Sequence, residues 1–367
     1  MNSLREKAIE LLKDYQLKYL KLNYGAKYEI HLKNINNKSN FNAFITEYVN
    51  SKDDLTDIER RNLLFELNKE ISSSILLNTE YESFAIWKIL KSTHDKFTEL
   101  NPDLTVNGDL YLGTILSNEI SAGTTFEKDL DALFILFDGE FINIALQLSK
   151  IIAQSIPLSE KEPHIIFPID IAELYNNICR SNSIKERIIG GLYFSIYKKP
   201  TDFPAYSLDN DLQEYISSML IESIEYFVFS HEMGHYFNGH LTGIKEDLDF
   251  AAMLKKDWEE EFEADLFGLN KIVELYKSTN KVFSLLGADI FFNFLILREK
   301  YDTRIKDDIS HPPATERLQT HRIFLSNFLN EIELENLAMH QAIIDSLFKY
   351  YEIIVNNFVN FKKTNGL

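Results

Sequence analysis

The chain has 367 residues, 45% of them hydrophobic and 26% charged, with a formal net charge of −18. This composition is typical of a globular protein of one large domain or two ordinary ones. So large a negative charge argues against nucleic acid or an anionic membrane surface as the partner. The sequence shows no signal-peptide pattern at its start, and its most apolar stretch, residues 282–297, is shorter than the roughly 20 residues that a membrane span needs. The single cysteine, Cys179, excludes an internal disulfide and is expected to be buried, so we predict a cytoplasmic protein without membrane spans.

The first 125 residues are predicted to be mostly helical. Apolar residues at helical spacing, capping-box pairs and a glycine stop indicate helices over residues 3–24, 56–77 and 80–100. Alternation over residues 28–32 is typical of a short strand. Because no catalytic constellation occurs in this region, we expect a regulatory or sensing role for it, through a regulatory partner.

The middle of the chain changes character. Glycine and polar residues become frequent between residues 101 and 128, which predicts a domain boundary there. Residues 132–137 form a short β-branched and aromatic run typical of a buried strand, and a helix is predicted over 140–155. Residues 163–171 and 191–197 also resemble extended segments. One of these is expected to be the sheet edge that pairs with a substrate backbone, and the sequence leaves open which one.

The pattern H-E-x-x-H occupies residues 231–235 and follows apolar residues spaced as on one face of a helix. On a helix, His231 and His235 lie one turn apart on the same face. Two neutral imidazoles in that arrangement can bind one zinc ion. Glu232 then lies beside the metal, where it can accept a proton from water. With only three fixed positions the pattern also arises by chance, so a third ligand is needed to support it.

A third ligand is available in a second predicted helix. Zinc in a hydrolase usually has three protein ligands and one open position. Glu261 and Asp265 lie four residues apart, so Glu261 is the candidate ligand and Asp265 the candidate acceptor of a ligand histidine's other ring N–H. Gly268 on the same side predicts close packing against the His231 helix, because a glycine within a helix costs about 1 kcal/mol relative to alanine. Three other acidic residues of this run are predicted to be solvated, Glu259, Glu260 and Glu263.

Two further features follow downstream. His240 gives the spacing H-E-x-x-H-x-x-x-x-H, which differs from the metzincin pattern. On a continued helix it would lie about 140° from His235 and point away from the metal, so a structural or surface role is predicted. The segment His311-Pro-Pro-Ala-Thr-Glu-Arg317 begins a further helix.

Taken in order, H-E-x-x-H-x-x-x-x-H, E-x-x-A-D and H-P-x-x-x-x-R resemble the motifs of HtpX-like and CAAX-protease-like zinc peptidases, which are gluzincins. The resemblance covers about residues 211–325. It implies one Zn²⁺ per chain and a set of three ligands, namely His231, His235 and Glu261. It further implies Glu232 as general base and Asp265 behind the ligands. Those families embed the motifs between membrane helices, whereas this sequence lacks such helices.

The same resemblance assigns roles to the third motif. His311 would stabilise the oxyanion of the tetrahedral intermediate, an interaction commonly worth about 3–4 kcal/mol. Arg317 would support that region. The segment 227–241 is also similar to soluble ImmA-like repressor proteases and to Lit-type proteases of phage exclusion, which would imply one narrowly recognised protein substrate.

The sequence therefore predicts a predominantly helical α+β fold. It would comprise an N-terminal region, residues 1–125, and a zincin-type peptidase domain with a small sheet, residues 126–367. The predicted function is that of a zinc metalloendopeptidase acting on a protein or peptide substrate. The alternative is a latent or inactive metallopeptidase fold that acts as a binding or sensing module. Substrate, cleavage site, oligomeric state and the choice between endo- and exopeptidase action stay open.

Overall fold

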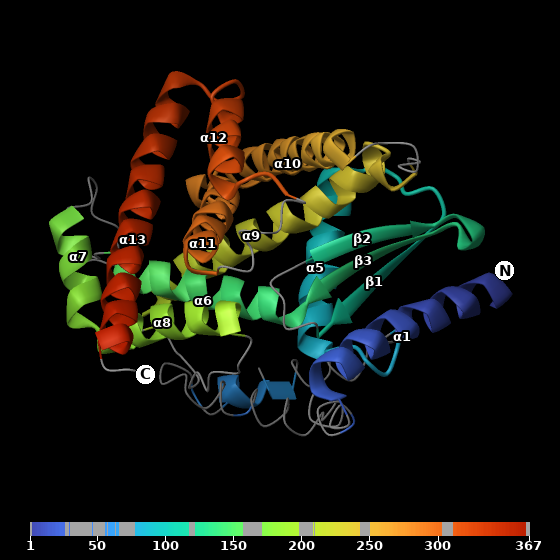
Figure 1. The fold of residues 1–367 in the computed structure, drawn as a ribbon, viewed down its shortest axis with the longest axis horizontal. Coiled ribbons are helices and arrows are strands. Elements are labelled where there is room, and N and C mark those ends of the chain that lie inside the picture. Colours follow the sequence, from blue (N-terminus) through green and yellow to red (C-terminus); the bar gives the residue numbers. More distant parts are fainter. Residues whose placement is uncertain are drawn as a thin grey trace.

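The computed structural model describes most of the chain. The described residues are 2–25, 29, 46, 56, 58–62, 64–65, 78–116, 122–156, 171–197, 208, 210–242, 250–302 and 311–364. They form a predominantly helical fold with one small mixed sheet, which confirms the predicted α+β class. The sheet lies at one end of the molecule, C-terminal helices lie at the other, and the long helix α9 (Asp211–Phe237) runs between them (Figure 1).

The sheet has three strands, β1 (Asp109–Ile115), β2 (Ala122–Glu127) and β3 (Ala132–Asp138). β3 is the central strand, parallel to β1 and antiparallel to β2. Every residue of β3 is buried, as its continuous apolar sequence predicts. The predicted strand at 132–137 is therefore confirmed, whereas the stretch read as a boundary contains β1 and β2. The division of the chain near residue 125 falls within β2 and stays a prediction.

Helix α1 (Asn2–Tyr24) covers one face of the sheet and confirms the first predicted helix. Its Ala8 and Leu12 share a small core with residues of β1 and β3. A Cβ on Gly113 of β1 would lie 2.6 Å from Leu12 Cδ1, so only glycine permits this approach. The side chain of Gln16 donates a hydrogen bond of 2.8 Å to the backbone oxygen of Thr114. One of the glycines that favoured a boundary in this stretch thus allows α1 to pack closely on the sheet.

Three helices pack on the opposite face of the sheet: α5 (Phe84–Leu100), α6 (Gly139–Ser155) and α9. The side chain of Asp138, the last residue of β3, caps α6 by accepting a hydrogen bond of 2.7 Å from the Glu140 amide. Phe137 of β3 lies 6.4 Å, centroid to centroid, from Phe229 of α9. The sheet therefore fixes the position of α9.

Helix α10 (Phe250–Thr279) packs along α9 at two glycines. A Cβ on Gly268 would lie 3.1 Å from the Phe227 ring, and one on Gly234 would lie 3.1 Å from Ala264 Cα. This close approach is what the position of Gly268 predicted. The remaining described elements are η2 (Lys128–Leu130), α7 (Ile171–Arg180), α8 (Asn182–Tyr197), η3 (His240–Thr242), η4 (Val282–Leu285), α11 (Gly287–Tyr301), α12 (Ala314–Leu325) and α13 (Glu331–Thr364).

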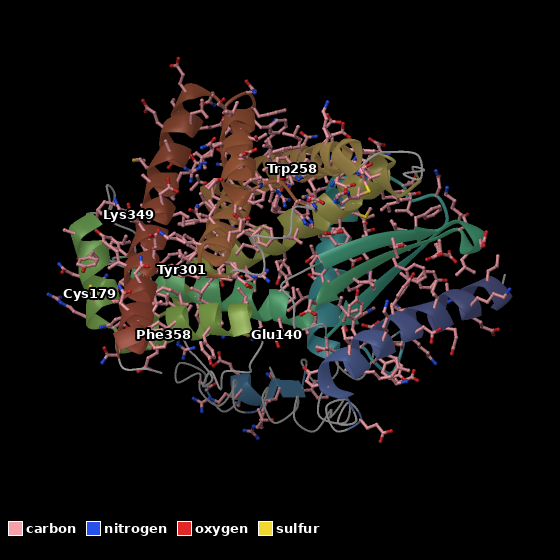
Figure 2. The ribbon with its side chains drawn as sticks, in the orientation of Figure 1. Glu140, Cys179, Trp258, Tyr301, Lys349 and Phe358 are labelled. Atoms are coloured by element: carbon pink, nitrogen blue, oxygen red, sulfur yellow. The ribbon has the colours of Figure 1, made fainter. Side chains whose placement is uncertain are left out.

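Two sequence predictions outside the three motifs are wrong. The segment 191–197 is the end of α8 rather than an extended segment. Three buried apolar residues at four-residue spacing give this helix its inner face, Ile184, Ile188 and Leu192. Cys179 is exposed rather than buried, since α7 turns Leu174 and Ile178 inward and leaves Cys179 at the periphery (Figure 2). The predicted extended segments 28–32 and 163–171 lie outside the described residues, except for Glu29, which is helical, and Ile171, which begins α7.

The capping box that opens the second predicted helix is confirmed. The Thr56 amide donates a hydrogen bond of 2.8 Å to Glu59 Oε2, and the Glu59 amide donates one of 3.3 Å to Thr56 Oγ1. Residues 58–62 are helical, while most of the predicted remainder of this helix lies outside the described residues. Among the described helices, none has both the length and the apolar character that crossing a membrane requires.

Candidate metal centre

The two histidines of the H-E-x-x-H pattern meet a glutamate of the neighbouring helix. His231 and His235 lie near the end of α9, and Glu261 lies on α10 where the two helices pack closely. The Nε2 atoms of the two histidines are 3.1 Å apart. The Glu261 carboxylate oxygens lie 3.6 Å from Nε2 of His231 and 3.5 Å from Nε2 of His235. Among the described residues these three form the group whose donor atoms could hold one metal ion.

The spacing of these donor atoms fits a tetrahedral zinc ion. With ligand distances of about 2.0–2.2 Å, the edge of a zinc tetrahedron is about 3.3–3.6 Å. The three separations of 3.1, 3.5 and 3.6 Å lie close to that edge length. Two imidazoles and one carboxylate also leave a fourth position of such a tetrahedron open.

A buried carboxylate fixes the orientation of His231. Its Nδ1 atom lies 2.9 Å from Asp265 Oδ1, although the ring is turned off the line of an ideal hydrogen bond. Arg317 of α12 holds the same carboxylate with two hydrogen bonds, from Nε at 2.7 Å and from an Nη atom at 2.6 Å. Because the carboxylate favours a proton on Nδ1 of His231, the lone pair of that ring lies on Nε2.

His240 orients the second histidine, contrary to the prediction that it points away. α9 ends at Phe237, and Gly239 adopts φ +80°, so the chain turns back instead of continuing as a helix. His240 Nδ1 thereby comes within 2.9 Å of His235 Nδ1, and its Nε2 lies 3.0 Å from Glu263 Oε2. The exposed Glu263 is therefore a partner of His240 rather than only a solvated residue.

The protonation pattern follows from these contacts. The Glu263 carboxylate can only accept a hydrogen bond, so a neutral His240 carries its hydrogen on Nε2 and its lone pair on Nδ1. His235 must then donate from Nδ1, which leaves its own lone pair on Nε2. Both Nε2 lone pairs, together with the Glu261 carboxylate, converge on one point. Such a convergence of electron pairs is unfavourable without a cation, and it is the arrangement that a zinc ion needs.

The carboxylates of the site are kept ionised by positive neighbours. Burial by itself would raise the pKa of Glu261, but its neighbours lower it far below its usual range: His235 and His231 to the extent that their rings carry a second proton, and Arg317, which is charged in either case. Burial is likewise outweighed at Asp265, whose pKa is lowered by Arg317 and His231. The same two carboxylates raise the pKa of Arg317 against the effect of its burial. An anionic ligand set is thus maintained inside the protein.

Glu232 lies buried at the wall of a cavity of about 400 Å³ beside this cluster. Burial raises the pKa of its carboxyl, an effect that the charges of His231 and His235 partly oppose. A carboxyl whose pKa is raised toward neutrality is suited to general-base catalysis. The cavity is also lined by Ala122, Gly123 and Thr124 of the edge strand β2.

His311 lines the same cavity, three residues before α12 begins. Its Nε2 atom is 3.6 Å from Glu261 Oε1, and its side chain is 57% exposed. The structure therefore brings together all seven residues singled out in the three motifs: His231, Glu232, His235, Glu261, Asp265, His311 and Arg317. Two partners, His240 and Glu263, were not identified as such from the sequence.

Comparison with known proteins gives one match. Residues 196–332 match the model of the family Peptidase U49. This match supports a peptidase. The matched stretch contains all seven residues of the three motifs together with His240 and Glu263, and it covers less than half of the chain. Neither the curated proteins nor the solved structures include one that matches.

Proposed function

We propose that this peptidase is zinc-dependent and hydrolyses peptide bonds of a protein substrate, with Glu232 as the general base. The observation that carries the proposal is the convergence of the Nε2 atoms of two imidazoles and one carboxylate on a single point. His231, His235 and Glu261 would be the metal ligands. The open cavity beside them provides room for a substrate next to the fourth coordination position.

When bound there, zinc would supply a Lewis acid that acidifies water and polarises a carbonyl oxygen. Glu232 would take the proton from the attacking water and later transfer it to the leaving amine. His311, across the cavity, would donate a hydrogen bond to the developing oxyanion. Asp265 and Arg317 do not face the substrate, and their role would be to hold His231 and Glu261 in position.

The edge strand β2 is the proposed binding element for the substrate backbone. β2 pairs with β3 on one side, and among the described residues no strand pairs with its other side. Ala122, Gly123 and Thr124 lie on the same cavity as Glu232, and Phe126 packs on Tyr236 of α9 with ring centroids 5.7 Å apart. An extended substrate could add to this edge as a further strand, which favours endopeptidase action.

The test is a survey of new protein N-termini in a cell lysate after incubation with zinc-loaded wild type, Glu232→Gln or Glu259→Gln. Glu259 is an exposed residue of α10 that forms an ion pair with the exposed Lys255. Its variant is therefore a control with the same change in charge. Wild type and the control should produce the same cleavages, and Glu232→Gln should reduce their rate by about 10²- to 10⁴-fold while retaining zinc. Zinc-loaded wild type that cleaves no more than Glu232→Gln would contradict the proposal.

A further inference from the structure

A second cavity, of about 530 Å³, lies between α5 and α9 and is separate from the metal centre. It shares no lining residue with the cavity at Glu232. One end is closed where Tyr226 of α9 packs on Phe97 of α5 and its hydroxyl accepts a hydrogen bond of 3.2 Å from Asn101. The size falls within the range of about 300–1,000 Å³ that is usual for small-ligand sites.

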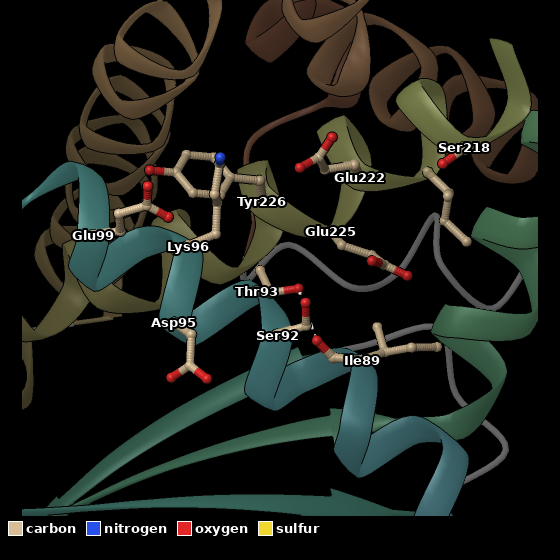
Figure 3. A pocket seen from close by; sticks show the side chains of 11 residues that line it. Ile89, Ser92, Thr93, Asp95, Lys96, Glu99, Ser218, Glu222, Glu225 and Tyr226 are labelled. Atoms are coloured by element: carbon tan, nitrogen blue, oxygen red, sulfur yellow. Dashed lines mark hydrogen bonds between the residues drawn. The ribbon is translucent and has the colours of Figure 1, made fainter. Parts of the chain in front are cut away.

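The carboxyl of Glu225 lies at the floor of this cavity. Figure 3 shows it pointing from α9 toward α5, on the side of Ile89 and Ser92. The side chain is buried, and its Oε1 atom accepts no hydrogen bond from any residue that the structure describes. A buried carboxylate oxygen without a hydrogen-bond donor makes ionisation of the group unfavourable. Native proteins normally pair such an atom, so its position in a cavity is suited to a bound donor.

The surroundings define the chemistry of that ligand. Three exposed carboxylates also line the cavity, Glu99 of α5, Glu222 of α9 and Asp95 of α5, and the last of these forms an ion pair with Lys91. The one basic group among the lining residues is Lys96, which forms no ion pair with Glu225. The excess of negative charge favours a cation over an anion or a neutral compound.

The cation is organic rather than metallic. Glu225 and the other carboxylates of the cavity do not bring three ligand atoms within 4.8 Å of one another, whereas the zinc candidate does. Apolar surface from Ile89, Ile221 and Tyr226 lies beside the carboxyl. An aliphatic chain can pack on that surface while a terminal ammonium reaches the Glu225 carboxylate.

We infer that the cavity between α5 and α9 is a binding site for a primary alkylammonium group, with the Glu225 carboxylate as its counterion. The group could belong to a free aliphatic diamine or to a lysine side chain of another protein. Both present the same cation on an aliphatic stem. The inference does not depend on catalysis, because Glu225 lies two helical turns before Glu232 and lines only this second cavity.

The state of Glu225 predicts how binding depends on pH. Burial, and to a lesser extent the charge of Glu222, raises the pKa of Glu225 to about 8. Near neutral pH the empty site is therefore mostly protonated, and binding of an ammonium requires release of that proton. The other charged groups facing the cavity are Asp95, Lys96, Glu99 and Glu222. Below the pKa of Glu225, the affinity for the ammonium should rise by up to about tenfold for each unit by which the pH is raised. This dependence should disappear in Glu225→Gln.

The experiment is calorimetric titration of the full chain at physiological salt with 1,5-diaminopentane, with Nα-acetyl-lysine N-methylamide and with 1,5-pentanediol. Wild type and Glu259→Gln should bind at least one of the two amines and not the diol. Glu225→Gln should weaken amine binding at least about tenfold. Binding of the diamine alone would assign the site to free amines, and binding of the lysine derivative would assign it to a protein side chain.

Three results would overturn the inference. They are equal binding of the diol and the amines, equal amine binding by Glu225→Gln and wild type, and absence of amine binding by folded wild type. Thermal unfolding of Glu225→Gln provides the check on folding, since removal of the buried charge should leave the variant at least as stable as wild type at pH 8. None of these readouts requires peptidase activity or bound zinc, so failure of this inference is distinguishable from failure of the proposed function.

Discussion

Glu225 is buried in the α5–α9 contact and Glu261 is largely buried in the α9–α10 contact, yet their environments are opposite. Glu261 faces two imidazoles and Arg317, and these neighbours lower its pKa despite its burial; the permanent positive charge among them is that of Arg317. Glu225 faces no cationic partner within bonding distance among the described residues, and burial raises its pKa to about 8. The comparison shows that burial alone does not decide the charge of a carboxyl. The groups placed around it do, and they determine whether it can act as a permanent metal ligand or as a group that exchanges a proton.

The largest expected effect comes from removing the cation that stabilises the first environment. Arg317→Met would leave Asp265 and Glu261 buried without their guanidinium partner, which typically costs about 3–5 kcal/mol of unfolding free energy. Urea unfolding in the presence of a chelator measures the loss. Zinc should restore part of the stability, because the metal supplies positive charge to the same carboxylates.

Arg317→Lys serves as the matched variant, since it keeps the charge and loses the two-point contact with Asp265. Its loss of stability should be smaller than that of Arg317→Met. Equal stability of Arg317→Met and wild type in chelator would show that the guanidinium is not what keeps Glu261 ionised.

The second environment is tested by the pH dependence of stability. The pKa of Glu225 is higher in the folded chain than in the unfolded chain, so its contribution to stability is complete at low pH and is lost as pH rises toward about 8. Over that interval the folding equilibrium constant of wild type should fall by up to about tenfold per pH unit relative to Glu225→Gln. Urea unfolding of both proteins between about pH 5 and 8 measures this difference. A difference that stays constant across the interval would contradict the raised pKa.

A smaller effect is expected from the carboxylate behind His231. Asp265→Asn would remove the negative charge that favours a proton on Nδ1 of the ring, and loss of such a partner typically lowers metal affinity about 10- to 100-fold. Competition with a chromophoric chelator measures zinc affinity, with Glu259→Gln as the charge-matched control. Unchanged affinity in Asp265→Asn would show that the ring is oriented by other contacts.

The smallest effect is expected at the second histidine. His240→Gln and Glu263→Gln interrupt the chain of contacts from His235 to the solvent, where the Glu263 side chain is 62% exposed and its charge is screened. Zinc affinity should fall by less than about tenfold in each variant. The double variant should lose little more than His240→Gln alone, because the glutamate acts through the histidine. A loss larger than that of Asp265→Asn would reverse the ranking of the two partners.

The helical part of the site could be predicted because its chemistry follows the period of a helix. His231, His235, Glu261 and Asp265 recur at spacings of four, and Gly268 indicated the close approach of the second helix. The position of His240 could not be predicted this way. It depends on the end of α9 at Phe237 and on the left-handed backbone of Gly239, which a continued helix does not include.

Other features depend on contacts that the sequence does not reveal. The glycines of the stretch that contains β1 favoured a domain boundary, and the packing role of Gly113 is evident only from the position of Leu12 on α1. Glu225 looked like any glutamate on a long helix, since nothing local separates it from the exposed Glu222. The alternation at 191–197 favoured a strand locally. The apolar residues at four-residue spacing that begin at Ile184 favour a helix over the longer stretch, and the structure has a helix there.

The central claim is that two imidazoles and one carboxylate form a zinc centre. The most direct test is the zinc content of the protein, purified without chelator and measured by mass spectrometry for wild type, Glu261→Gln and Glu259→Gln. The account predicts one zinc ion per chain in wild type and in Glu259→Gln, and its loss in Glu261→Gln. Wild type that binds no zinc even when zinc is supplied, or Glu261→Gln that retains it fully, would contradict the account.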